Sequence, residues 1–135
     1  MEKYKIDKNI SVVCITATTF PDGVMVAHQA VHAKFAAGNN RRFFGISRPD
    51  RTGTIIYKAA AELLPGETND DLETFTIKKG MYLGRYIHNF MSDVQQVGKT
   101  FREILDQPDL DPNGYCLEIY EGENDVRCLV GLAED

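Results

Sequence analysis

The chain contains little clustered positive charge. Of its 135 residues, 15 are lysine or arginine and 20 are aspartate or glutamate, which gives a net charge of −5. The only basic doublets are Arg41-Arg42 and Lys78-Lys79. Proteins that bind DNA or RNA usually present a clustered basic surface. We therefore expect no direct nucleic-acid binding, and no helix-turn-helix pattern is evident.

Cysteine is scarce, and so are apolar residues near the N-terminus. The three cysteines, Cys14, Cys116 and Cys128, lie in apolar runs, and none forms a CxxC pair. This pattern is typical of reduced, buried thiols, so we expect a cytoplasmic protein. Charged residues follow directly after Met1. We therefore expect neither a signal peptide nor membrane insertion.

The sequence also lacks a phosphate-binding glycine loop and a complete metal-binding motif. His28 and His32 are four residues apart on a predicted helix, a spacing that can bind zinc. However, Gln29 occupies the position of the glutamate in HExxH, and no third ligand is nearby. We expect no metal and no cofactor.

What is present is a regular succession of apolar segments. Runs of β-branched and aromatic residues predict strands over 10–17, 42–47, 54–58, 72–77, 81–88, 114–120 and 126–132. Helical spacing of apolar residues predicts one helix from about residue 24. A second helix is predicted from Ser92, where Ser92 and Gln95 have the form of a capping box. Residues 59–64 fit either a longer strand or a short helical turn.

This order predicts a duplicated α+β fold. A strand-helix-strand-strand unit occurs at about 10–64 and again at about 72–132, where the second half has one additional strand at its start. We expect a single domain over residues 1–135. Its antiparallel sheet should carry two helices on one face and a ligand groove on the other.

One carboxylate interrupts an apolar strand. Side chains alternate across a strand, so Leu117 and Ile119 share one face and Glu118 shares the other with Tyr120. We expect the apolar pair to lie under a helix and Glu118 to point to the helix-free face. Alternation alone favours a solvated carboxylate at this position. When the two halves are overlaid, however, the counterpart of Glu118 is Gly45, which leaves room for a ligand to approach.

Three segments resemble a known family. They are Lys79-Gly80-Met81-Tyr82, Leu117-Glu118-Ile119-Tyr120, and Phe44-Gly45-Ile46-Ser47 followed by Pro49-Asp50. Their order and spacing, from about residue 12 to 132, are similar to those of GyrI-like small-molecule-binding domains. That family includes the effector-binding halves of AraC-type and MerR-type regulators as well as stand-alone proteins. The sequence departs from the family at 78–80 and 121–124, two turns at the rim of the expected pocket.

The resemblance implies a stand-alone protein that binds a small amphipathic molecule, cationic in many members of the family. In the family the strand glutamate contacts the ligand, and Glu118 is the matching residue. Aromatic side chains around placed polar groups are the usual lining of such pockets. We expect the walls to come from Tyr82, Tyr86, Tyr120 and Phe43.

Two other functions are open at this stage. Some GyrI-like proteins hydrolyse strained electrophilic molecules with a glutamate and a tyrosine, which here would be Glu118 with Tyr82 or Tyr120. Alternatively, the helix-free face around Glu118 can bind a protein partner.

Overall fold

The described part of the chain, residues 1–35, 40–68 and 71–134 of a computed structural model, forms one antiparallel sheet and two α-helices. In chain order the elements are β1 (Glu2–Ile6), β2 (Ile10–Thr16), α1 (Val24–Lys34), β3 (Phe43–Pro49), β4 (Ile55–Glu62), β5 (Glu73–Ile77), β6 (Gly80–Ile87), the short 3-10 helix η1 (Phe90–Ser92), α2 (Gln95–Leu105), β7 (Cys116–Glu121) and β8 (Asp125–Gly131). The predicted α+β class is confirmed.

The sheet exchanges strands between the two halves of the sequence. Its order is β1-β6-β8-β7-β3-β4-β2-β5. The chain order strand-strand-helix-strand-strand occurs in β1 to β4 and again in β5 to β8. β1 pairs with β6 of the second half, and β5 pairs with β2 of the first. The expectation of an additional strand only in the second half is wrong. β1 escapes detection because it lies at an edge, where Lys3 and Lys5 are exposed and no apolar run develops.

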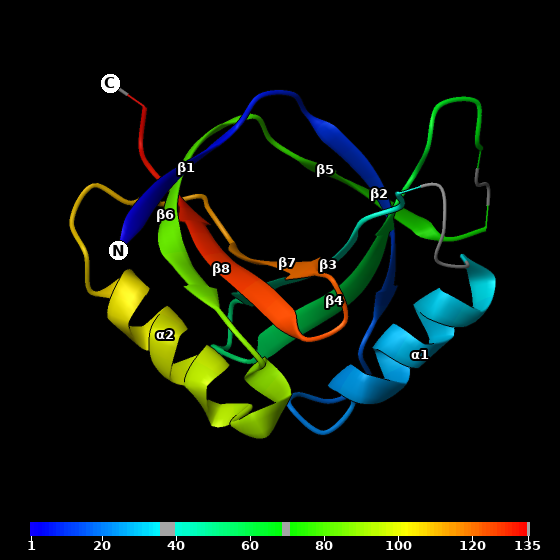
Figure 1. Cartoon of the computed structure of the whole chain (residues 1–135), viewed down its shortest axis with the longest axis horizontal. Coiled ribbons are helices and arrows are strands. Elements are labelled where there is room, and N and C mark those ends of the chain that lie inside the picture. Colours follow the sequence, from blue (N-terminus) through cyan, green and yellow to red (C-terminus); the bar gives the residue numbers. More distant parts are fainter. Residues whose placement is uncertain (36–39, 69–70, 135) are drawn as a thin grey trace.

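The sheet curls until its two edge strands share one core (Figure 1). Ile6 of β1 and Ile77 of β5 lie at opposite ends of the strand order, yet both belong to the same buried cluster. Phe44, Leu117 and Leu129, from β3, β7 and β8, also belong to that cluster. The helix-free face is therefore the packed inside of a half-barrel, with its own hydrophobic core.

The two helices lie outside the curl, on either side of the central strands (Figure 1). α1 packs on β2 and β4 through Ala27 and Val31, and α2 packs on β6 and β8 through Phe101 and Ile104. The central pair β3–β7 lies between them in the strand order. Within the described ranges, no helix is long and apolar enough to cross a membrane.

The second helix begins later than the sequence predicts. The capping box is not formed: α2 starts at Gln95, and its N-cap residue Val94 makes no side-chain cap. Ser92 instead closes η1, where its hydroxyl donates to the carbonyl of Asn89 at 2.9 Å. Residues 59–62, which the sequence left open, continue strand β4.

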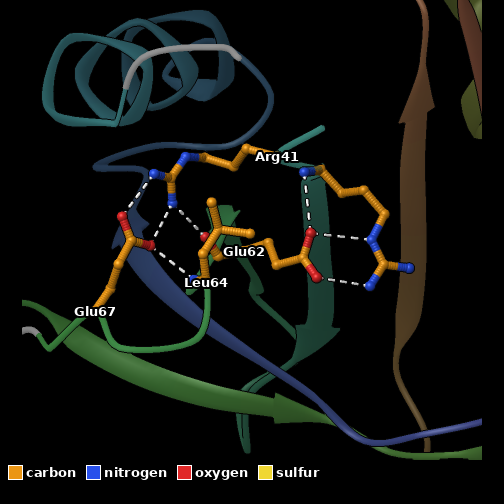
Figure 2. A network of polar contacts seen from close by, with 5 residues as sticks. Arg41, Glu62, Leu64 and Glu67 are labelled. Carbon is orange, nitrogen blue, oxygen red and sulfur yellow. Dashed lines mark hydrogen bonds and ion pairs between the residues drawn. The ribbon is translucent and has the colours of Figure 1, made fainter. Parts of the chain in front are cut away.

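A buried arginine anchors the chain where β4 ends (Figure 2). The side chain of Arg41 is 9% exposed and donates to both carboxylate oxygens of Glu67 at 2.8 Å, and to the carbonyl of Glu62 at 2.6 Å. The amide of Leu64 donates to the same Glu67 carboxylate at 2.7 Å. Beside it, Arg42 forms a more exposed pair with the Glu62 side chain. Arg41 therefore ties the start of β3 to the turn that follows β4.

Candidate functional site

Glu118 lies at the centre of the sheet, directly opposite Gly45. The two residues are partners across β7 and β3, the middle strands of the order. Glu118 is only 8% exposed, and among the described residues it is the one charged side chain in the buried class. A carboxylate in such a place needs polar partners, because burial without them is costly.

The prediction that Glu118 points to the helix-free face of the sheet is wrong. Leu117 and Ile119 point into the half-barrel core, and Glu118 points outward, between the two helices. The prediction assigned the apolar pair to the helices because an apolar face normally lies under one. Here the curl of the sheet gives the helix-free face a core of its own, so Leu117 and Ile119 are buried there instead.

The polar partners of Glu118 are two tyrosines, and a histidine contacts both tyrosine hydroxyls. Tyr57 donates from its hydroxyl to Oε1 of Glu118 at 2.8 Å, and Tyr120 donates to the same oxygen. His28 on α1 lies with Nε2 at 2.7 Å from the Tyr57 hydroxyl and at 3.4 Å from that of Tyr120. Because Tyr57 gives its proton to the carboxylate, the Nε2–H of His28 donates to Tyr57. Oε2 of Glu118 accepts no hydrogen bond from the described residues.

This cluster of Glu118, Tyr57, Tyr120 and His28 depends on the glycine opposite. A Cβ atom at Gly45 would lie 2.6 Å from Oε1 of Glu118 and still closer to the Tyr57 hydroxyl. Real Cβ atoms essentially never approach so closely. Gly45 therefore makes the space in which the Tyr57–Glu118 hydrogen bond forms.

Burial dominates the electrostatics of the cluster. It raises the pKa of Glu118, and the hydrogen bonds from Tyr120 and Tyr57 only partly oppose that shift. Burial, followed by the charge of His32, lowers the pKa of His28 to about 4, so His28 is neutral at pH 7. Burial also raises the pKa of Tyr57 and Tyr120, so both remain protonated donors.

Among the described residues, no cation compensates the charge of Glu118. None of the ion pairs formed in the described part of the chain includes it, and its hydrogen-bond donors are all neutral. In most buried carboxylates an arginine or lysine supplies the opposite charge. The cluster thus contains a negative charge in its ionised form and no positive one.

Aromatic rings flank the cluster on both sides. Phe20, in the segment between β2 and α1, stacks on Tyr57 with centroids 5.9 Å apart and is 46% exposed. Phe90 of η1 lies against Tyr120 at 5.7 Å. A molecule that reaches Glu118 from the side of the helices therefore meets aromatic faces first.

The structure brings together only some of the residues expected at the site. Tyr120 bonds to Glu118, as described. Phe43 lies on the same face but stacks on His32 at 3.9 Å, under α1. Tyr82 and Tyr86 project from β6 to the inner side of the half-barrel.

The two tyrosines of β6 have partners of their own. Tyr82 donates to the carbonyl of Lys78 at 2.7 Å and lies 2.9 Å from the Tyr115 hydroxyl. Tyr86 donates to Asp125 at 2.7 Å and lies under the guanidinium of Arg127. Neither hydroxyl contacts Glu118.

Two members of the cluster were not predicted. Tyr57 could have been found from the register of the β3–β4 hairpin, in which Gly45 pairs with Ala59 and Tyr57 lies two residues further on the same face. His28 carried no comparable signal, because only the packing of α1 brings it to the sheet. In the described ranges no three histidine, cysteine or carboxylate side chains are grouped as metal ligands.

Comparison with known proteins identifies the fold but not a family. No family model matches the chain, and no curated protein matches it. Among solved structures, the chain is similar to the integron cassette protein VCH_CASS2 from the mobile metagenome of Vibrio cholerae, with a TM-score of 0.68 and 14% sequence identity. The match covers 97% of this chain and 94% of the other. The chain therefore has the fold of that cassette protein, and membership of the GyrI-like family stays a prediction.

Proposed function

We propose that this protein binds a small amphipathic cation at Glu118, between α1 and α2. The observation that carries the proposal is a buried carboxylate whose hydrogen-bond partners are all neutral. Ionising such a group without a counter-charge costs several kcal/mol. A bound cation supplies that charge, so the free energy lost on burial is recovered on binding.

The remaining geometry supports the same ligand class. Oε2 of Glu118 accepts no hydrogen bond from the described residues, so it is available to an ammonium group. Tyr57 and Tyr120 contact the carboxylate, Phe20 and Phe90 pack on these two tyrosines, and a cation over an aromatic face gains further attraction. An apolar group on the ligand can cover the exposed ring of Phe20.

Calorimetric titration with benzyltrimethylammonium tests the proposal. We expect saturable binding that weakens about tenfold or more in Glu118→Gln, because a buried charge pair is lost. Phenylmethanesulfonate, a similar ring with the opposite charge, should not bind at this site. The exposed Glu123, changed to glutamine, is the matched control and should leave the affinity unchanged.

Equal binding of the cation by the wild type and Glu118→Gln would contradict the proposal. So would failure of the wild type to bind it at millimolar concentration. Backbone amide shifts at Tyr57 and Tyr120 locate the bound cation, and shifts confined to the inner side of the half-barrel would also reject the assignment.

Hydrolysis of a strained electrophile is the second candidate, favoured by the two hydroxyl donors on Oε1 of Glu118. With an epoxide, Glu118 would take a proton from water while the water oxygen attacks a ring carbon. The carbon–oxygen bond of the ring would break, and Tyr120 would give its proton to the leaving oxygen. Styrene oxide is a suitable probe: the diol should form with the wild type and with Glu123→Gln, and not with Glu118→Gln. Turnover that survives in Glu118→Gln would exclude this role.

A further inference from the structure

The inner side of the half-barrel opens at one end into a pocket that does not include Glu118. Its volume is about 850 Å³, within the range of pockets that hold small molecules. Five segments of the chain line it: the end of β3, the start of β4, the β5–β6 turn with the strand ends beside it, the loop before β7, and residues 131–134. The sheet separates this end pocket from the Glu118 cluster, because the two lie on opposite faces.

One wall of the end pocket is aromatic and held in place. Tyr82 donates to the carbonyl of Lys78, and Tyr115 accepts from the amide of the same residue at 3.1 Å. The two hydroxyls are 2.9 Å apart, so Tyr115 donates to Tyr82. Phe75 meets the Tyr115 ring edge-on at 5.2 Å, and Ile46 is buried beside them. These hydrogen bonds fix the rings, which favours a flat apolar ligand placed against them.

The rim of the end pocket carries three cations that form no ion pair within the described ranges, although Arg48 donates to the carbonyl of Asn113 at 3.5 Å. Within the described ranges, no carboxylate pairs with Lys78, Lys79 or Arg48, and all three are exposed. The fourth lining cation, Lys58, is already paired with Glu73.

Two of the three lining carboxylates, Asp50 and Asp111, are turned toward their own loops, and the third, Glu134, is exposed. Asp50 accepts from the amide and hydroxyl of Thr52 and from the amide of Thr54, and Asp111 accepts from the amide of Asn113. Apart from Asp50 and Asp111, the lining charged groups without an ion pair in the described ranges are Lys78, Lys79, Arg48 and Glu134, so positive groups outnumber negative ones three to one.

We propose that the end pocket binds a small planar organic anion, such as an aromatic carboxylate. The flat part of the ligand lies against Tyr82, Tyr115 and Phe75, and its carboxylate faces Lys78 and Lys79. This site is independent of the cation site at Glu118, and it takes a ligand of the opposite charge.

Amide chemical shifts of the protein titrated with 2-naphthoate test this proposal. We expect saturable shifts at residues 46–50, 75–82 and 111–115, with a submillimolar dissociation constant. The double variant Lys78→Gln, Lys79→Gln should bind about five- to tenfold more weakly, as expected for two solvent-exposed charges. Lys34→Gln with Lys99→Gln removes the same charge from the exposed helix surfaces and should change the affinity less than twofold.

The neutral analogue 2-naphthamide separates charge recognition from burial of the ring. The wild type should bind the amide more weakly than it binds the carboxylate. The Lys78, Lys79 double variant should bind the amide and the carboxylate about equally well. Absence of saturable shifts, equal affinity of acid and amide for the wild type, or an unchanged affinity in the double variant would each overturn the proposal. Glu118→Gln should leave naphthoate binding unchanged. Each of the two proposed sites can therefore be rejected without rejecting the other.

Discussion

Replacing Glu118 with glutamine removes the charge at the centre of the site and keeps its shape. Oε1 accepts both tyrosine hydrogen bonds, and the amide oxygen of glutamine can accept them in its place. The amide nitrogen then occupies the position of Oε2, which accepts no hydrogen bond from the described residues. The substitution therefore isolates the effect of the buried charge.

The size of the change in the free energy of unfolding follows from the burial and the hydrogen bonds of Glu118. Desolvation of the carboxylate costs several kcal/mol, and each hydrogen bond to a charged acceptor offsets about 1.5 kcal/mol or more. With two such bonds, we expect Glu118→Gln to raise the free energy of unfolding at pH 7 by about 1–3 kcal/mol.

The gain in stability of Glu118→Gln over the wild type must increase as the pH rises. Burial raises the pKa of Glu118 in the folded protein above its ordinary value of 4.5. Below that value the carboxyl is protonated in both states, and no charge is buried. As the pH rises toward the folded pKa, only the unfolded chain releases its proton. In this window the wild type loses about 1.4 kcal/mol per pH unit relative to the variant.

Urea denaturation from pH 4 to pH 8 measures the difference in the free energy of unfolding between the wild type and Glu118→Gln. All other carboxylates are common to both proteins and cancel in the comparison. Glu123→Gln serves as the control for removal of a charge without burial. A difference between Glu118→Gln and the wild type that is the same at every pH, or a variant that is less stable at pH 7, would refute the reasoning.

Four further predictions concern stability and binding. Gly45→Ala should lower the free energy of unfolding by about 1–3 kcal/mol, because the new methyl group collides with the tyrosine and carboxylate at the centre. Gly98→Ala, on an open helix surface, should raise it by about 0.5–1 kcal/mol in the same urea assay. Arg41→Met should lower the urea midpoint more than Arg42→Met, since the Arg41 guanidinium is the more buried; equal effects would contradict this. Affinity for benzyltrimethylammonium should rise with pH and level off above the folded pKa of Glu118, because protons compete with the cation; a flat profile by calorimetry would contradict this.

The sequence alone determined most of the segments that form strands and helices, and it identified Glu118 as an unusual residue within a strand. Alternation and helical spacing are local properties, so they predicted the strands from β2 to β8 and both helices to within a few residues. They also singled out Glu118 as a carboxylate between two apolar residues and Gly45 as its counterpart. The structure pairs these two residues directly across β3 and β7.

The start of the second helix and the first strand were harder to predict from the sequence. The Ser92 capping pattern was present but unused, because the chain forms η1 before α2 begins. β1 carries exposed lysines at alternate positions, and only its pairing with β6 makes it a strand. At β1 the pairing with a distant strand overrode the local signal, whereas Ser92 uses its hydroxyl in a local hydrogen bond to Asn89.

Only the tertiary structure decided which way Glu118 points and what surrounds it. Alternation divides a strand into two faces, but it cannot say which face a helix covers when both are buried. The curl of the sheet gives the inner face its own core, which places Leu117 inside and Glu118 beneath the helices. Helix packing then brings His28 to Tyr57. These contacts join residues far apart in sequence, and their geometry is set by the closure of the whole sheet.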